Sequence, residues 1–157
     1  MAAVYELHDA RIDLASAVSM PPEIFESWAR SRAAGIDPER PGYYRVAEED
    51  LHARLRASHD FVVTARHHMP WVSAFLGDIP HVVVLTDAAG VVLHSIGSDA
   101  MREQWRLMPG SDWSEARMGT NGVGTALATG ATITIVGEQH YCKELAAITC
   151  LAATIVV

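Results

Sequence analysis

The sequence lacks the features that mark secreted and membrane proteins. It has only two cysteines, Cys142 and Cys150, too few for a disulfide framework. No apolar run approaches the ~20 residues of a membrane-spanning helix. Charged residues are spread through positions 1–17, so no signal peptide is visible. These absences predict a cytoplasmic chain with no membrane contact.

A basic surface is also lacking. The formal net charge is −7, whereas a DNA-binding module shows clustered Lys and Arg. The one basic group, formed by Arg30, Arg32, Arg40 and Arg45, is diluted by acidic residues at positions 37, 39, 48 and 49. We interpret it as a solvated face, and we expect no direct contact between this chain and nucleic acid.

The eight histidines do not form a metal-binding pattern. His52 and His59 share a helix face, but no His-x-x-x-His pair accompanies them. His81 and His94 lie at expected strand ends, where hydrogen-bonded structural roles are more common than ligation. The sequence therefore predicts no metal and no cofactor, and nothing in it selects for a haem.

The first half of the chain is predicted to be helical. Pro21 and Pro22 begin a helix that Gly35 ends. A second helical region runs from about 48 to 76, with a kink or a junction of two helices expected at Pro70. Its stripe has heptad-like spacing and comprises Leu51, Leu55, Ser58, Val62, Ala65, Met69, Val72 and Leu76. The stripe is compatible with packing inside one subunit or with a homodimer interface.

The second half alternates strands and short helices. Strands are expected over 81–85 and 91–96, around a Gly-bearing turn. A short helix over 99–107, a loop over 108–118, a helix over 122–129 and a strand over 132–136 follow. A loop or short helix over 138–146 and a strand within 148–157 end the pattern. This order predicts an α+β fold, with an antiparallel sheet flanked by helices.

The most informative segment is Gly119-Thr-Asn-Gly-Val-Gly-Thr-Ala-Leu127. Its three glycines and its Asn-Gly pair suit a tight corner, because both residue types tolerate positive φ. The glycine order is not that of a dinucleotide fingerprint, and no Lys follows as in a phosphate loop. The corner therefore serves either to bind an anion or carbonyl at a helix N-terminus or only to pack.

Further motifs flank this corner in a fixed order. Trp113-Ser-Glu precedes it, and Gly137-Glu-Gln-His-Tyr141 and Cys150-Leu-Ala-Ala153 follow it. Near the other end, Ser27-Trp-Ala-Arg-Ser-Arg32 leads to Gly35-Ile-Asp-Pro38. Over roughly 21–157, the series resembles the N-terminal sensory GAF domain of bacterial sigma-54-dependent enhancer-binding activators of the acetoin/dihydroxyacetone regulator type.

The resemblance implies a GAF-like domain over 47–157, preceded by an N-terminal helical extension over 1–46. In the family, a further strand and a closing helix follow the last strand seen here, and then an ATPase module and a DNA-binding module. The implied function is small-molecule sensing that controls transcription activation through an attached or partner output module. The implied partners are a small organic effector and a second copy of the chain, bound through the helices around 51–76.

The same resemblance places the effector in an apolar cavity beside the loops over 108–121 and 137–142. Its expected ligand-binding residues are Trp113, Thr120, Asn121, Thr125, Glu138, His140, Tyr141 and Cys150. Structural alternatives stay open for each motif. Trp113 is either a lid or a core plug, and Glu138 and His140 either contact the effector or cap the corner helix.

Two other functions compete with sensing. Free-methionine sulfoxide reductases are GAF-fold enzymes with a nucleophilic and a resolving cysteine, and Cys142 lies near Lys143 and His140. Cys150, however, opens an apolar strand and resembles a buried small hydrophobe. The other alternative is a dimerisation module without a ligand. We expect no catalytic residues and no enzymatic activity.

Overall fold

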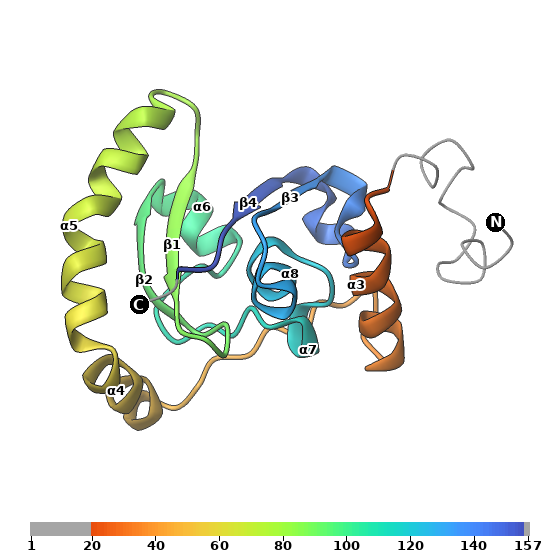
Figure 1. Cartoon of the computed structure of the whole chain (residues 1–157), viewed down its shortest axis with the longest axis horizontal. Coiled ribbons are helices and arrows are strands. Elements are labelled where there is room, and N and C mark those ends of the chain that lie inside the picture. Colours follow the sequence, from red (N-terminus) through yellow and green to blue (C-terminus); the bar gives the residue numbers. More distant parts are fainter. Residues whose placement is uncertain (1–19, 156–157) are drawn as a thin grey trace, which may run out of the picture. The chain divides into compact units, whose positions relative to one another are not determined.

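The computed structural model describes residues 20–155 (Figure 1). The chain divides into two compact units, each treated separately below. Unit 1 combines residues up to 42 with residues from 114 onward, and unit 2 spans 43–113. The described residues form six α-helices and two antiparallel two-stranded sheets, which confirms the α+β class. Within this part of the chain, no helix is both long and apolar enough to cross a membrane.

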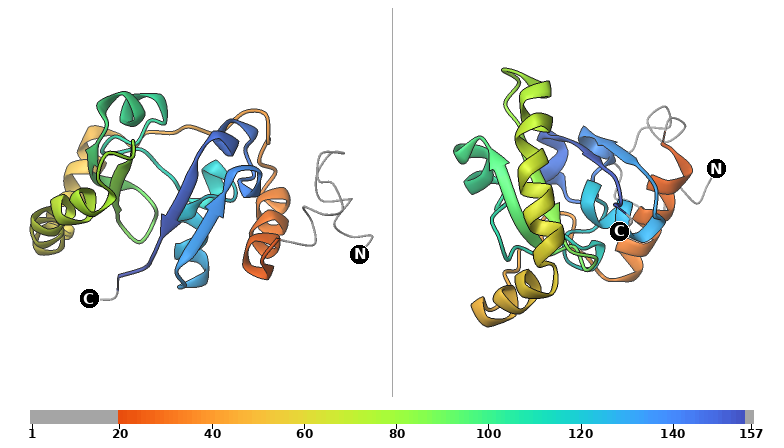
Figure 2. Two further views of the ribbon diagram at one scale, coloured as in Figure 1. Left: turned by 90° about the horizontal axis from the view of Figure 1, so that it is seen from above. Right: turned by 60° about the vertical axis from the view of Figure 1, so that its left-hand side comes forward.

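Unit 2 is a β-hairpin covered by a long helix. It contains α4 (Glu48–Ala57), α5 (His59–Leu76), β1 (Val82–Thr86), β2 (Val92–Gly97) and α6 (Asp99–Gln104). The strands pair from Val82↔Gly97 to Thr86↔Val92, and α5 lies along them (Figure 2). The core between helix and hairpin is apolar and comprises Val62, Met69, Leu85 and Leu93.

Part of the apolar stripe over 51–76 packs inside the chain. Leu51, Val62 and Met69 are buried within the chain, so for them packing inside one subunit is the outcome. Of the two outcomes expected at Pro70, the junction is wrong, because α5 runs through Pro70 and the two helices meet at Ser58. The kink stays a prediction. A proline keeps a helix-compatible φ and removes one hydrogen bond, whereas Ser58 leaves helical geometry at φ −108° and ψ 20°.

Unit 1 surrounds a second core. It contains α3 (Pro22–Ala33), α7 (Glu115–Met118), α8 (Gly122–Thr129), β3 (Ile133–Val136) and β4 (Thr149–Ala152). Two 3-10 turns, η1 (Gly137–Gln139) and η2 (Lys143–Ala147), join β3 to β4. Helix α8 packs against both strands and against α3. The core comprises Ile24, Trp28, Ala126, Ile133, Ile135 and Tyr141.

The single expected sheet is instead two hairpins among the residues described. β1 pairs with β2 in unit 2, and β3 pairs with β4 in unit 1. Each hairpin packs its apolar face against its own helix, so each unit has its own core. The loop expected over 108–118 contains the short helix α7. The part of the expected helical extension before residue 20 and the end of the last expected strand lie outside the described residues.

The glycine-rich corner forms the helix expected over 122–129. Asn121 caps α8, since its Oδ1 accepts a hydrogen bond from Gly124 N at 3.0 Å. Its Nδ2 donates to Gly119 O at 2.8 Å. Gly119 has φ +65°, and Gly130 ends α8 at φ +69°. Gly124 is needed for space, because a Cβ there would lie 2.4 Å from Glu115 N.

Replacing Gly124 with alanine tests this packing. Alanine favours a helix by ~1 kcal/mol over glycine, but the clash with backbone forces α7 and α8 apart. We expect Gly124→Ala to lower the free energy of unfolding by about 3 kcal/mol, measured by urea denaturation. Gly130→Ala is the control, because its Cβ meets nothing within 4 Å and only the positive φ costs ~1 kcal/mol. Equal losses would contradict the packing argument.

Candidate ligand-binding site

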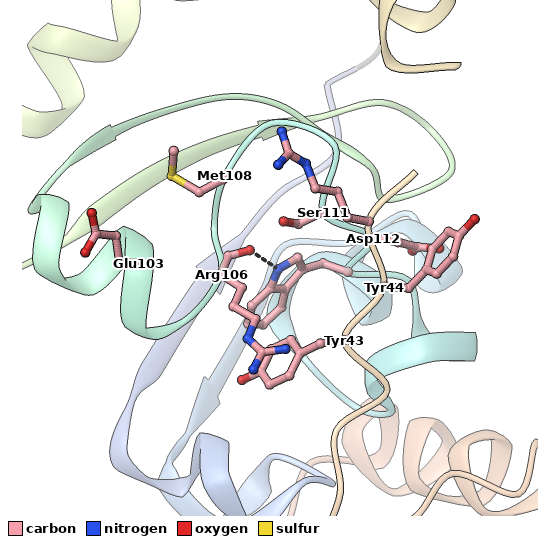
Figure 3. Close-up of a pocket in the computed structure, with 9 residues that line it drawn as sticks. Tyr43, Tyr44, Glu103, Arg106, Met108, Ser111 and Asp112 are labelled. Carbon is pink, nitrogen blue, oxygen red and sulfur yellow. Dashed lines mark hydrogen bonds between the residues drawn. The ribbon is translucent and has the colours of Figure 1, made fainter. Parts of the chain in front are cut away.

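Unit 2 contains a pocket of about 370 Å³ beside α6 (Figure 3). This volume lies within the range of small-molecule sites. Aromatic, apolar and charged side chains of both signs line it, and they are Tyr43, Tyr44, Arg45, Glu103, Arg106, Met108, Ser111, Asp112 and Trp113.

Two segments far apart in the sequence form the pocket wall. Asp112 N donates to Tyr44 O at 3.0 Å, and Val46 N donates to Gly110 O at 2.9 Å. These bonds pair residues 44–46 with residues 110–112 as a short antiparallel ribbon. The ribbon is fixed to the hairpin, because Val92 N donates to Ser111 O at 2.8 Å.

Arg106 lies at the centre of the aromatic side of the pocket. Its guanidinium carbon is 4.2 Å from the centroid of the Tyr43 ring, a cation–π contact. Its carbonyl oxygen lies 3.5 Å from Trp113 Nε1, the hydrogen bond drawn in Figure 3. The rings of Tyr43 and Trp113 meet edge to face at 6.5 Å. The pocket thus offers flat aromatic surface beside a cation, which suits a small polar organic molecule.

Of the eight expected ligand-binding residues, only Trp113 lines this pocket. Trp113 is buried, with its ring packed against Tyr43. The other seven belong to unit 1. Among these, Glu138 is exposed in η1, while Thr120, Asn121 and Thr125 are fully buried. That these seven residues bind an effector stays a prediction.

The buried corner residues form a hydroxyl cluster with α3. Ser27 Oγ lies 2.8 Å from Thr120 Oγ1 and 3.0 Å from Thr125 Oγ1. It also donates to Glu115 Oε1, and Ser31 Oγ lies 3.2 Å from Thr120 Oγ1. Arg30 covers the cluster with Nε 2.7 Å from Glu115 Oε2. These contacts favour a structural role for Thr120 and Thr125.

His140 and Cys150 face each other. His140 Nδ1 lies 2.9 Å from Gly137 O, and because a carbonyl only accepts, Nδ1 carries the proton. His140 Nε2 is then an acceptor for the Cys150 thiol at 3.3 Å. Burial lowers the pKa of His140 and raises the pKa of Cys150. The pair is therefore neutral and lacks the imidazolium that would stabilise a thiolate.

Tyr141 belongs to the core. Its ring meets Trp28 edge to face at 5.3 Å, and burial raises the pKa of its phenol. Trp28 Nε1 donates to Gln139 O at 2.8 Å, which fixes the η1 turn against α3. The segment 137–141 is thus held by packing against α3 of the same unit.

Cys142 is unsuited to nucleophilic catalysis. It is fully buried, and burial raises its pKa to about 12, with Asp37 and Glu144 adding to the effect. Its thiol donates to Met118 O at 3.3 Å. Across the described residues, no three His, Cys, Asp or Glu side chains converge as a metal site would require.

Most of the pocket was missed from the sequence. Tyr43, Tyr44 and Arg45 lie between the two expected helical regions, and Arg45 belongs to the basic group interpreted as a solvated face. The adjacent Tyr43 and Tyr44, in a polar stretch, are the one local signal from which an aromatic site could have been predicted. Nothing local relates them to Arg106, since only the fold brings these segments together.

Thiol reactivity tests the structural assignment of both cysteines. At pH 7.5 a thiol with a pKa of about 12 is almost wholly protonated, so we expect Cys142 to react with iodoacetamide at least ~100-fold more slowly than glutathione. Cys150 is expected to react slowly as well, because burial raises its pKa. Mass spectrometry with time measures both. Fast labelling of the folded chain, at the rate seen in 8 M urea, contradicts this assignment.

The chain is similar to known proteins. Residues 10–156 match the family model "MimR, N-terminal domain". The acetoin catabolism regulatory protein of Cupriavidus necator is 36% identical over 135 residues, which cover 83% of this chain and 20% of the relative. The propane 2-monooxygenase operon transcriptional activator MimR of Mycolicibacterium goodii is 33% identical over 138 residues, which cover 85% of this chain and 23% of the relative.

A solved structure shares the fold. The chain in the crystal structure of the E. coli DhaR(N)–DhaL complex matches with a TM-score of 0.72 at 16% identity, over 80% of this chain and 44% of that chain. This chain spans about a fifth of the length of the curated relatives quoted above. Those relatives are named as regulators and activators, not as enzymes, in line with the expected lack of catalysis. The family expected from the motifs is confirmed, and the chain belongs to the MimR N-terminal domain family.

Proposed function

We propose that this chain is a small-molecule sensor that regulates transcription activation, and that its effector binds in the pocket of unit 2. The observation that carries the proposal is the group formed by Tyr43, Arg106 and Trp113, where aromatic faces and a cation line one cavity. Ligand sites combine such apolar surface with a few polar groups that orient the ligand.

The names of the relatives suggest the size of the effector. They refer to acetoin and to propane, molecules of four and three carbons. Acetoin carries a hydroxyl group, as does propan-2-ol, the alcohol formed by oxygenating propane at carbon 2. We propose a small oxygenated molecule that packs on Tyr43 and accepts a hydrogen bond from the Arg106 guanidinium.

The output of such a sensor lies in other modules. An attached or partner module, sigma-54-dependent in the resembled activators, would bind DNA and open the promoter in the cytoplasm. This chain, with its net charge of −7, would not touch the nucleic acid. We keep the expected division into an extension over 1–46 and a sensory domain over 47–157 as part of this proposal.

Nuclear magnetic resonance of the indole N–H groups tests the pocket. The chain has four tryptophans, and Trp113→Phe identifies the signal of Trp113. We expect acetoin or propan-2-ol to shift this signal saturably, with a Kd on the order of 1 mM, as suits so few atoms. Tyr43→Ala should weaken binding at least ~10-fold by removing the stacking surface.

Glu138→Ala is the matched control, because Glu138 is exposed and belongs to the residues expected from the sequence. It should leave the Kd within about twofold if the ligand occupies the pocket of unit 2. A lost response in Glu138→Ala, or no saturable shift of Trp113 with either molecule, contradicts the proposed site.

A homodimer is the second proposal, and an exposed face of α5 favours it. Trp71 and Phe75 are 74% and 91% exposed, and Val72 is 51% exposed. Residues one turn apart share a face, and this face points away from the buried Val62 and Met69. The two aromatic side chains alone present roughly 300 Å², a large part of the ~800 Å² that each partner contributes to a standard interface.

A second copy of the chain is the partner that this face suits. No Asp, Glu, Lys or Arg occurs from His67 to Gly77. Across a twofold axis the same patch faces itself, so charges of one sign within it would repel. A neutral aromatic face avoids that repulsion, and it offers no charge for a charged partner to recognise.

Sedimentation at ~100 µM, a range where weak dimers form, measures the oligomeric state. We expect the chain to be a dimer and Trp71→Glu with Phe75→Glu to be a monomer, because two like charges would meet at the axis. Leu151→Glu is the control, since Leu151 is 75% exposed in unit 1 and should leave the dimer intact. A monomeric wild-type chain, or a control that dissociates equally, overturns this interface.

A further inference from the structure

The pocket is built on the two places where the chain passes between its units. The backbone enters unit 2 at Gly42–Tyr43 and leaves it at Trp113–Ser114. Tyr43 and Trp113 are therefore the first and last residues of unit 2, and both line the pocket. We call residues 43–46 and 110–113 the two crossings. An occupant of the pocket contacts both at once.

A short backbone pairing joins the two crossings. Two hydrogen bonds join them, from Asp112 N to Tyr44 O at 3.0 Å and from Val46 N to Gly110 O at 2.9 Å. Tyr44, in the first crossing, is 46% exposed. The second crossing is largely buried, with Ser111 7% and Trp113 2% exposed. A short pairing with one exposed side opens locally at a lower cost in free energy than a buried one, so side chains that touch both crossings affect how closely they stay paired.

Arg106 touches both crossings. Its guanidinium lies over the Tyr43 ring at 4.2 Å, and its carbonyl oxygen accepts from Trp113 Nε1 at 3.5 Å. The sticks of Figure 3 show the guanidinium beside the labelled Tyr43 ring. One residue of the loop after α6 thus contacts the first residue of unit 2 with its side chain and the last with its backbone.

The backbone of Arg106 makes this side chain unusual. Arg106 has φ +50°, the one positive value outside glycine in the described residues. Leu107 N donates to Arg102 O at 2.8 Å and Arg106 N donates to Glu103 O at 3.2 Å, the paired bonds of a Schellman motif at the end of α6. Glycine normally occupies this position, because a side chain there is strained. An arginine in it indicates a compensating contact made by the side chain.

We propose that Arg106 is a positioning residue that holds the two crossings together, and that an effector in the pocket acts on the crossings through it. The proposal deepens the proposed function, on which its second half rests. A molecule stacked against Tyr43 and Arg106 binds best when the crossings are paired. By this differential affinity it shifts the chain toward the paired state.

Hydrogen exchange of the Val46 and Asp112 amides, which join the crossings, tests the first half without any ligand. Arg106→Gln and Arg106→Lys form a matched pair, because both keep the carbonyl and the same strained φ. Glutamine lacks the charge, so we expect Arg106→Gln to exchange both amides roughly two- to fivefold faster, the range of an exposed cation–π contact. Arg106→Lys should exchange within about twofold of wild type.

In Arg106→Gly, we expect overall stability and the pairing of the crossings to change in opposite directions. Glycine suits the positive φ, so the urea midpoint should be kept or raised, while the same two amides exchange faster. The Val62 amide, bonded to Ser58 O in α5, reports overall opening and should not change. The proposal is overturned if these two amides exchange equally fast in wild type and Arg106→Gln. It is also overturned if Arg106→Lys speeds their exchange as much as Arg106→Gln does.

Acetoin, at a concentration that saturates the Trp113 indole shift, tests the second half. We expect slower exchange of the Val46 and Asp112 amides in the wild type and no slowing in Arg106→Gln. A saturable shift without any slowing overturns the regulatory half and leaves the proposed effector site standing. Absence of binding contradicts the proposed function, while the ligand-free exchange result still decides whether Arg106 holds the crossings.

Discussion

The buried hydroxyl of Ser27 is the interaction on which unit 1 depends. It lies within hydrogen-bond distance of Thr120, Thr125 and the Glu115 carboxylate, and so joins α3 to α7 and α8. The hydroxyls of Ser27, Thr120 and Thr125 are removed from water, and a buried polar group left without a partner costs ~1–3 kcal/mol. The three helices therefore have one satisfied arrangement, and the spacing of the glycine-rich corner follows from it.

This cluster explains why the corner attracts a functional interpretation from sequence alone. Hydroxyl and amide side chains among glycines are what an anion site at a helix N-terminus needs, and they are equally what a buried cap needs. An anion site and a buried cap differ only in the groups to which these side chains hydrogen-bond. Asn121 uses its side chain on Gly124 and Gly119, and Ser27 comes from a helix far away in the sequence. No local sequence pattern predicts the contact of Ser27 with the corner.

What the sequence predicted well was set by local chemistry. Prolines begin α3 and glycines end α3 and α8, and β-branched runs around Asp87 form the hairpin. What it missed depends on long-range contacts. The division into two hairpins, the junction at Ser58 and the pocket each depend on which faces meet. The ordered motifs identified the family correctly, because several together are specific, yet they indicated residues that mostly support unit 1.

The free energies involved also show which of two regions, the Ser27 cluster or the pocket of unit 2, a small ligand could rearrange. A ligand of six non-hydrogen atoms with a millimolar Kd supplies about 4 kcal/mol, and only its differential affinity for two states is available to shift them. Opening the Ser27 cluster would expose several buried polar groups at ~1–3 kcal/mol each, more than such a ligand can offset. The exposed contact of Arg106 with Tyr43 is worth ~0.5–1 kcal/mol. The free energy of such a ligand therefore exceeds the contact of Arg106 with Tyr43, whereas it does not offset the loss of the buried hydrogen bonds in the corner.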